Sequence, residues 1–461
     1  MSFGAVKDTI AQKIRALLQN THSLSAQKVL RLEVQSPELN LLDWVSSQID
    51  NSKIYWLSRD NSFEMAGIGR ADMVYSNSCS SYDKPFSAIL EKLPRDTSVH
   101  YYGGIDFYPP AKKTDATYRR RKEKEWKSFG AYCFLLPQFE IVKRKGKPFL
   151  ACNILTHDIT KSLIKKYLKA LENISFSRAP RSVPIPQIHA FSLFPNIKEW
   201  QVLFKEHIQP SGKMAYKKIV LAQKTAIEFA SKVSPLEVFR KLTHQAHGSF
   251  HYYFQPQKNC AFFGASPERL FKRQGARIES EALAGTRPRG KTSEEDAYYE
   301  KILRDSPKDA LEHKIVVKSI KDTFQRLCAR WKADNLPSVT KASSAHHLIT
   351  RFWGTLKDTV DDAQILTALH PTPAVGGIPR NQALNTIVKF EPFDRGWYAG
   401  PIGYIGRDTV DFAVALRCAL MQDRYINLYA GAGIVEGSSA DEEWREIEQK
   451  KSIFFNLFKK H

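Results

Sequence analysis

The order of apolar and polar residues divides the chain into a front region, residues 1–200, and a back region, residues 201–461. Residues 1–20 carry apolar side chains at helical spacing between charged ones, which predicts an amphipathic helix. Further along the front region, runs rich in β-branched and aromatic residues predict strands at 53–57, 63–68, 131–136 and 139–143. The last two runs flank Pro137, and we expect them to form a hairpin.

In the back region, apolar runs alternate with glycine-dense segments. Such segments are either turns or places where the backbone approaches a ligand closely. They lie at 262–266, 284–286, 375–377, 400–406 and 430–433. Apolar stripes at helical spacing predict helices at 309–332 and 440–458. A proline-rich stretch, 179–186, is the expected connector between the two regions.

The composition is that of a folded globular protein, with 43% hydrophobic and 25% charged residues among 461. No run approaches the roughly 18 apolar residues of a membrane span, and residues 1–20 lack the apolar core of a signal peptide. The six cysteines are widely spaced and form no CxxC pair, which argues against a disulfide framework or a structural zinc site. We therefore expect a cytoplasmic protein that does not enter a membrane.

The net charge of +21 is the unusual feature of the composition. A positive net charge is compatible with binding nucleic acid, an anionic surface or an acidic small substrate, and it does not distinguish among these partners. The basic runs 119–122 and 143–145 lack the interleaved aromatic residues of a base-stacking platform. A basic nucleic-acid-binding protein is therefore kept as the distant alternative, and we expect no nucleic-acid partner.

Carboxylates recur three residues apart on both predicted helices of the back region. Asp309 and Glu312 share one helix face, and Glu443 and Glu446 share another, with Lys450 one turn further on. Two such pairs could hold a hard divalent cation such as Mg²⁺, which prefers oxygen ligands. Taken alone, acidic pairs on amphipathic helices are more often solvated surface.

Three further side chains stand in apolar surroundings that suit chemistry. Lys218 heads the run KIVLA, where a lysine either reaches water or is desolvated and acts as a base. Glu268 follows a buried-looking strand, where a carboxyl can stay protonated and serve as an acid. Arg417 lies inside the apolar run DFAVALRCAL and needs a carboxylate partner from the protein or from a substrate.

Read in order from about residue 211 to 458, the back region resembles the chorismate-utilising enzymes, the family of isochorismate, salicylate, anthranilate and aminodeoxychorismate synthases. The strings that carry the resemblance are KIVLAQ (218–223), FGASPERL (263–270), EALAGTRPRG (281–290), EHKIVV (312–317), HPTPAVGGIPR (370–380), FDRGWYAGPIGYIG (393–406), ALRCAL (415–420) and AGAGIVEGSSADEEWREIEQK (430–450). The resemblance implies an α/β (α+β) fold of large antiparallel β-sheets packed face to face and surrounded by helices. Residues 1–200 would contribute strands to that fold, and residues 201–461 would form the chorismate-binding catalytic region.

Within this family, the resemblance implies Mg²⁺-dependent isomerisation of chorismate to isochorismate, weakly of the menaquinone type. Lys218 matches the base that activates water for attack at C2, and Glu268 matches the acid that protonates the departing C4 hydroxyl. Ala284 stands where aminodeoxychorismate synthases carry a lysine nucleophile, and Lys218 stands where anthranilate enzymes carry glutamine, so no glutaminase subunit is expected. Ala374 stands where pyruvate-eliminating members carry threonine, so the reaction would stop at isochorismate. Salicylate synthase, which goes on to eliminate pyruvate, is the alternative.

The same resemblance assigns the binding residues. Glu312 and Glu446 would hold Mg²⁺, with Asp309 and Glu443 acting through water. Substrate contacts are expected at Gly285, Thr286, His370, Arg417, Gly431, Gly433 and Lys450. Arg417 and the amides near Gly431 and Gly433 would hold the enolpyruvyl carboxylate, and Gly285 would approach the C4 oxygen. The expected partner is therefore chorismate alone, bound by a monomer or weak dimer.

Overall fold

The computed structural model describes residues 2–18, 28–94, 98–110, 124–177, 183–209, 214, 216–342 and 345–459. The basic run 119–122 and the first part of the expected connector 179–186 lie outside these residues.

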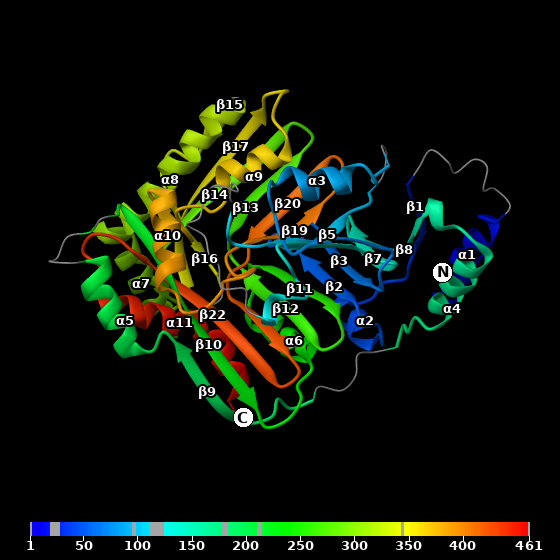
Figure 1. The fold of residues 1–461 in the computed structure, drawn as a ribbon, viewed down its shortest axis with the longest axis horizontal. Coiled ribbons are helices and arrows are strands. Elements are labelled where there is room, and N and C mark those ends of the chain that lie inside the picture. Colours follow the sequence, from blue (N-terminus) through cyan, green and yellow to red (C-terminus); the bar gives the residue numbers. More distant parts are fainter. Residues whose placement is uncertain are drawn as a thin grey trace.

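Eleven α-helices in the described residues surround two large sheets (Figure 1). They are α1 (Phe3–Ala16), α2 (Leu41–Ser47), α3 (Asp83–Leu90), α4 (Lys161–Glu172), α5 (Ile197–Leu203), α6 (Pro235–Gln245), α7 (Ser293–Asp305), α8 (Pro307–Leu327), α9 (Asp362–Leu369), α10 (Arg380–Phe390) and α11 (Ala440–Phe458). The two helices with carboxylate pairs have defined starts. The Ser306 side chain accepts the Asp309 N–H before α8, and the Ser439 side chain accepts the Glu442 N–H before α11.

The first sheet has twelve described strands, and all of their pairings are antiparallel. Its order is β1 (Val29–Gln35), β8 (Lys147–Leu155), β7 (Phe139–Arg144), β3 (Glu64–Ile68), β2 (Lys53–Leu57), β11 (Phe250–Gln257), β12 (Cys260–Ser266), β21 (Cys418–Gln422), β22 (Tyr425–Ile434), β10 (Lys218–Phe229) and β18 (Gly377–Ile378). The twelfth strand, β9 (Ile188–Phe194), also pairs with β10. Strands from before and after residue 200 thus belong to one sheet, and they pair with each other at β2–β11 and β9–β10.

The second sheet has ten described strands, again antiparallel throughout. Its order is β15 (Cys328–Ala333), β17 (Ala345–Leu356), β14 (Arg277–Pro288), β13 (Arg269–Gln274), β20 (Thr409–Val414), β19 (Pro401–Ile405), β5 (Tyr101–Ile105), β6 (Tyr132–Leu136) and β4 (Asp72–Ser76), with β16 (Ser338–Lys341) on β17. Here too a front strand, β5, pairs with a back strand, β19.

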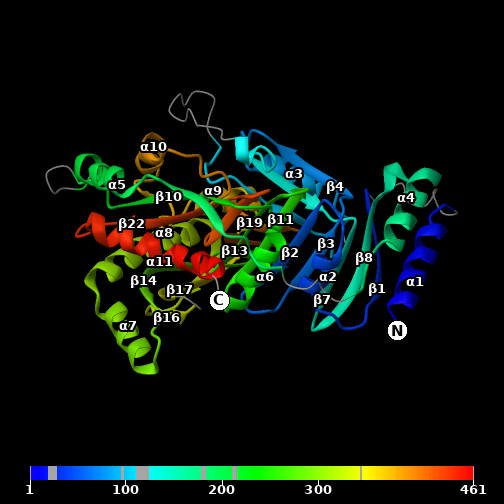
Figure 2. The same cartoon turned by 90° about the horizontal axis from the view of Figure 1, so that it is seen from below.

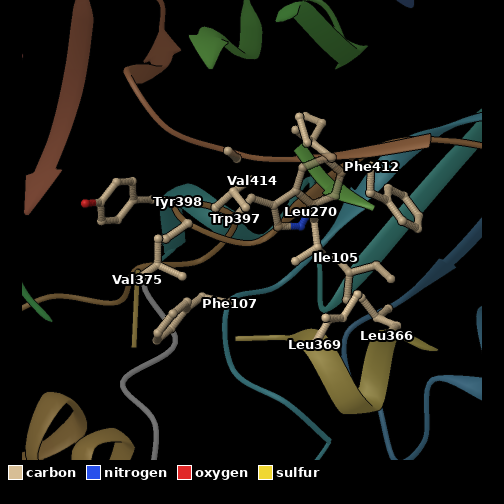
Figure 3. Close-up of a cluster of buried hydrophobic side chains, with 14 of the residues drawn as sticks. Ile105, Phe107, Leu270, Leu366, Leu369, Val375, Trp397, Tyr398, Phe412 and Val414 are labelled. Carbon is tan, nitrogen blue, oxygen red and sulfur yellow. The ribbon is translucent and has the colours of Figure 1, made fainter. Parts of the chain in front are cut away.

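The two sheets face each other across an apolar core. Trp56 on the first sheet meets Tyr404 on the second, with ring centroids 6.0 Å apart. Figure 3 shows part of this core, in which Val375 and Tyr398 lie near Trp397 and Phe107. A second apolar cluster lies between the first sheet and the helices on its outer side, which include α1, α2, α4, α6 and α11 (Figure 2). The predicted fold class is thus confirmed.

The structure corrects three predictions about local elements. The segments on either side of Pro137 do not form a hairpin, because β6 belongs to the second sheet and β7 to the first. The helix predicted at 309–332 ends at Leu327, and the chain continues as strand β15, whose ladder partner is β17. The glycine-dense segments 262–266, 284–286 and 430–433 are strands rather than turns.

Within the described part of the chain, no helix combines the length and the apolar character needed to cross a membrane.

Candidate active site

A pocket lies where the chain passes between the two sheets. Glu268 stands on the short crossover from β12 to β13, and Arg417 stands on the crossover from β20 to β21. The two crossovers are tied together, because the Ala265 N–H donates to the Arg417 carbonyl at 3.2 Å. Arg417 takes a left-handed backbone conformation with φ of 46°, which turns the chain sharply at this point.

Nine of the residues predicted for the site line this pocket. They are Glu268, Gly285, Thr286, Glu312, Arg417, Gly431, Gly433, Glu446 and Lys450. They come from β14, α8, β22, α11 and the two crossovers, so side chains separated by up to 182 positions meet in one place. Ala284 and Ala374, the two positions expected to distinguish reactions within the family, also line it.

Lys218 is not among the residues that line the pocket, but its fully buried side chain contacts Glu312, which does line it. Its Nζ donates to Oε1 of Glu312 at 2.8 Å. Lys218 begins β10, where its backbone is paired with Ile378 of β18. Glu312 comes from the first half of α8, so the contact joins the first sheet to the helix that packs on the second.

All four carboxylates that the sequence predicted for a metal site are paired with basic side chains. The pairs are Lys218–Glu312 at 2.8 Å, Lys450–Glu446 at 2.7 Å, Lys308–Glu443 at 2.6 Å and Arg287–Asp309 at 2.5 Å. Among the described residues, no three His, Cys, Asp or Glu side chains are grouped closely enough to hold a metal ion. The carboxylates are therefore arranged as neighbouring ion pairs and do not form a ready-made cage.

The four carboxylates still influence one another. Burial raises the pKa of Glu443 to about 7, and the negative charge of Glu446 adds to the effect. Burial also raises the pKa of Asp309, with further contributions from Glu312 and Glu446. Burial opposes ionisation of Glu312 as well, but Lys218, by its charge and hydrogen bond, brings the pKa of Glu312 below its ordinary value. Although each carboxylate has a basic partner, neighbouring carboxylates still raise the pKa values of Glu443 and Asp309, and clustered carboxylate oxygens are the donors that Mg²⁺ takes, so these residues fit that ion.

Glu268 is buried, with 3% of its surface exposed, and it lines the pocket. Its backbone N–H donates to the Ser266 side chain at 3.2 Å, and its carbonyl accepts the Val414 N–H at 3.1 Å. Burial raises the pKa of Glu268 to about 8, and the nearby negative charge of Glu281 adds to this effect. The carboxyl is therefore mainly protonated at neutral pH, as a general acid must be.

Arg417 meets a histidine that the sequence analysis did not single out. Nε2 of His347 lies 3.0 Å from the Arg417 guanidinium, and Nδ1 lies 3.2 Å from the Gly285 carbonyl. The Nδ1 proton is assigned to the bond with that carbonyl, which leaves Nε2 to accept from Arg417. Burial, followed by the charge of Arg417, lowers the pKa of His347. Within the described residues Arg417 has no carboxylate partner, and burial lowers its pKa to about 10.

Two glycines are required by the close packing around the Lys218–Glu312 pair and around Asp309. A Cβ at Gly433 would lie 2.5 Å from Oε1 of Glu312 and 3.0 Å from Cε of Lys218. Gly285 has φ of +75°, and a Cβ there would lie 3.1 Å from Cβ of Asp309. Gly431 and Gly433 pair with β10 in a regular ladder, and the Gly431 carbonyl accepts from Lys450 at 2.8 Å.

His370 is placed differently from the other predicted contacts. Its ring is buried beside Tyr82 and Phe107, and Nε2 lies 2.8 Å from the Phe107 carbonyl. It is not among the residues that line the pocket, and neither are Asp309 and Glu443. His370 therefore connects α9 to the segment after β5, and we do not carry it forward as a substrate contact.

Comparison with known proteins places this fold and pocket in a defined class. The family described as "Chorismate binding enzyme" matches residues 14–458. The chain belongs to this family of chorismate-binding enzymes.

Within the family, the chain is similar to isochorismate synthases. It is 32% identical over 408 residues to the chloroplastic isochorismate synthase of Catharanthus roseus, covering 87% of this chain and 69% of that protein. It is 27% identical to isochorismate synthase MenF of Haemophilus influenzae, covering 97% of each. The solved structure of MenF, the menaquinone-specific isochorismate synthase from Escherichia coli, superimposes with a TM-score of 0.81 at 25% identity, covering 98% of this chain and 100% of that one.

Proposed function

We propose that the chain is an isochorismate synthase of the menaquinone type, which isomerises chorismate to isochorismate by adding water at C2 and removing the C4 hydroxyl. The observation that carries this proposal is the pocket in which Glu268, Arg417 and the Glu312 and Glu446 carboxylates meet, with Lys218 paired to Glu312 behind it. The similarity to isochorismate synthases over nearly the whole chain supports it.

Glu268 acts as the general acid. The C4 hydroxyl of chorismate is a poor leaving group until it receives a proton, and a carboxyl with a pKa near 8 holds a proton at neutral pH. Burial keeps this proton from being lost to solvent before the substrate arrives. The proton passes from the Glu268 carboxyl to the departing oxygen, which leaves as water.

Lys218 acts as the general base for the attacking water. To accept a proton, its amine must be neutral and must turn away from Glu312, with which it is paired at 2.8 Å. The pairing with Glu312 is thus the resting arrangement, and the catalytic arrangement requires it to loosen.

Chorismate carries two carboxylates, and the pocket offers separate positions for them. The Arg417 guanidinium, held by His347, would bind the enolpyruvyl carboxylate through charge-assisted hydrogen bonds. Glu312 and Glu446 would hold Mg²⁺, with Asp309 and Glu443 acting through water. When bound, the ion supplies positive charge for the ring carboxylate. Fixing both ends of the substrate orients the ring between acid and base.

Two small residues at the pocket support isomerisation over the related reactions. Ala284 offers no amine for attack on the ring, and Ala374 lacks the hydroxyl associated with pyruvate elimination in similar enzymes. We therefore propose that the reaction stops at isochorismate and needs no glutaminase subunit. A cytoplasmic location and a monomer or weak dimer remain predictions.

Purified protein incubated with chorismate and Mg²⁺, followed by chromatography of the products, tests the proposal. Isochorismate as the product, lost on addition of EDTA and restored by Mg²⁺, is the expected result. Salicylate with pyruvate would instead identify a salicylate synthase, and anthranilate formed from added ammonia would identify an amination enzyme. If chorismate were left unchanged, the proposed function would be wrong.

A further inference from the structure

Arg59 is far from Glu268 in the sequence but close to it in the fold. It lies in the turn between β2 and β3, in the front region of the chain. Its Nη1 donates to Oε1 of Glu281 at 2.6 Å, and its Nη2 donates to Oε2 at 2.7 Å. The same Nη1 also donates to the carbonyl of Pro267 at 2.6 Å. A turn of the front region is thus fastened to the crossover that carries Glu268.

Glu281 holds the other side of the same crossover. It lies within β14 with 4% of its side chain exposed, and its Oε1 accepts the Arg269 N–H at 2.9 Å. One arginine–glutamate pair therefore contacts both chain neighbours of Glu268. The guanidinium groups of Arg59 and Arg269 also lie over the Phe250 ring, 5.5 and 5.2 Å from its centroid, which further restricts this segment.

The pair also determines part of the electrostatic environment of Glu268. After burial, the charge of Glu281 is the largest contribution that raises the pKa of Glu268. Positive charges from three elements oppose it, namely Lys218 on β10, Lys450 on α11 and Arg59 in the turn. The other charged or titratable groups at this pocket are Glu312, His347, Tyr398, Arg417, Tyr429 and Glu446. Loss of the Glu281 charge would lower the pKa of Glu268, and loss of the Arg59 charge would raise it.

We propose that Arg59 and Glu281 are positioning residues for the general acid Glu268. The inference rests on the proposed isochorismate synthase function. Together the two residues hold the backbone on both sides of Glu268, and the charge of Glu281 favours the protonated carboxyl. The front region thus contributes directly to the arrangement of the acid, although none of its described residues lines the pocket.

Two variants test this by opposite effects on the pH profile of kcat. Glu281→Gln keeps an acceptor for the Arg269 N–H but removes the negative charge, so the alkaline limb should move down by about one pH unit. Arg59→Gln removes the opposing positive charge and leaves Glu281 ionised, so the same limb should move to higher pH. A merely structural role would lower kcat in both variants without moving the limb in opposite directions.

Asp362→Asn provides the matched control. Asp362 forms a buried bidentate pair with Arg273, including a 2.9 Å bond from Nη2 to Oδ2, and neither residue lines the pocket. Its loss should lower stability and leave the pH profile unchanged. An unmoved limb in both test variants, or a shift in the same direction, would overturn the proposal.

A second measurement does not depend on turnover. Titration of the Glu268 carboxyl by ¹³C NMR, assigned by its loss in Glu268→Gln, should show the same two opposite shifts. If Glu281→Gln does not fold, Arg59→Gln decides alone, because Arg59 is 22% exposed and Glu281 keeps the Arg269 N–H as a hydrogen-bond donor. If the wild-type protein makes no isochorismate, the proposed function fails, while the titration still confirms or overturns the positioning role.

Discussion

Nζ of Lys218 lies 2.8 Å from Oε1 of Glu312, so the residue expected to be the base is paired with a residue expected to be a metal ligand. The same arrangement occurs at Lys450 and Glu446, 2.7 Å apart. A carboxylate oxygen that ligates a dication is a poorer partner for an ammonium group. On the proposed assignments, metal binding and release of the base would therefore be linked through Glu312.

Replacement of Lys218 should separate the loss of the base from the effect of its pairing on metal binding by Glu312. We expect Lys218→Ala to lower kcat by about 10²- to 10⁴-fold, because no other side chain takes the proton from water. The same variant should bind Mg²⁺ about tenfold more tightly by calorimetry, since Glu312 loses a charge-assisted partner. Lys217→Ala, at the exposed neighbouring position, should leave both quantities near the wild-type values. Normal turnover in Lys218→Ala would refute its role as the base.

The alkaline side of the pH profile should report Glu268. Because its carboxyl must be protonated to act, kcat should fall as pH rises through about 8. Glu268→Gln should lower kcat by about 10²- to 10⁴-fold across the range, because the amide cannot supply a proton. A wild-type profile that stays flat from pH 6 to 10 would contradict this assignment.

Stability should depend on the same carboxyl. The pKa of Glu268 is raised from 4.5 to about 8 in the folded protein, so the folded state holds a proton that the unfolded state loses first. Its contribution to stability is therefore complete below about pH 4.5 and is lost as pH rises to about 8. Urea unfolding should show Glu268→Gln becoming more stable than wild type toward pH 8, by an amount of order a few kcal/mol. An unchanged difference between pH 5 and pH 8 would argue against the buried proton.

Loss of a metal ligand should lower the affinity for Mg²⁺ more than it lowers the stability of the fold. Glu446→Gln should reduce Mg²⁺ affinity by at least about tenfold, since even residues that only support ligands cost that much when replaced. Glu448→Gln is the matched control on α11, because Glu448 is 43% exposed and pairs with Lys451 instead. Calorimetric titration with MgCl₂ measures both variants. Equal affinities would exclude Glu446 as a ligand.

Gly433 tests the packing around the Lys218–Glu312 pair. In Gly433→Ala, the new Cβ would lie 2.5 Å from Oε1 of Glu312, so the pair must separate. We expect kcat to fall by about 10²-fold and stability to fall by about 1–3 kcal/mol. Gly4→Ala, where a Cβ lies 3.9 Å from its nearest neighbour within α1, should leave kcat unchanged and should not lower stability. Thermal unfolding and steady-state kinetics distinguish the two sites.

Most residues of the candidate site could be predicted from the sequence, because they lie in strings of the back region that resemble those of a known family. Glu268, Arg417 and one carboxylate from each pair, Glu312 on α8 and Glu446 on α11, indeed meet at one pocket. The course of the chain between sheets could not be predicted. Pro137 separates two strands whose local pattern fits a hairpin, and only their partners in space, β4 and β5 for β6 and β3 and β8 for β7, decide the sheet of each.

The supporting residues were also beyond the reach of local pattern. His347 lies in an ordinary strand pattern, AHHLITRF, and becomes significant only because Arg417 and Gly285 fold against it. Arg59 contacts Glu281 across 222 positions of sequence. The end of α8 at Leu327 was missed for a similar reason. The apolar stripe continues into Cys328, but pairing with β17 takes the following residues into a strand.

Isotope labelling tests the central claim, that Lys218 activates a solvent water for attack at C2 while Glu268 protonates the C4 hydroxyl as it leaves. The protein is incubated with chorismate and Mg²⁺ in H₂¹⁸O, and the isochorismate is analysed by mass spectrometry after a short reaction. The account predicts one ¹⁸O atom in the product, located on C2. Unlabelled isochorismate would contradict it, because the hydroxyl would then have moved within the substrate without a water-activating base.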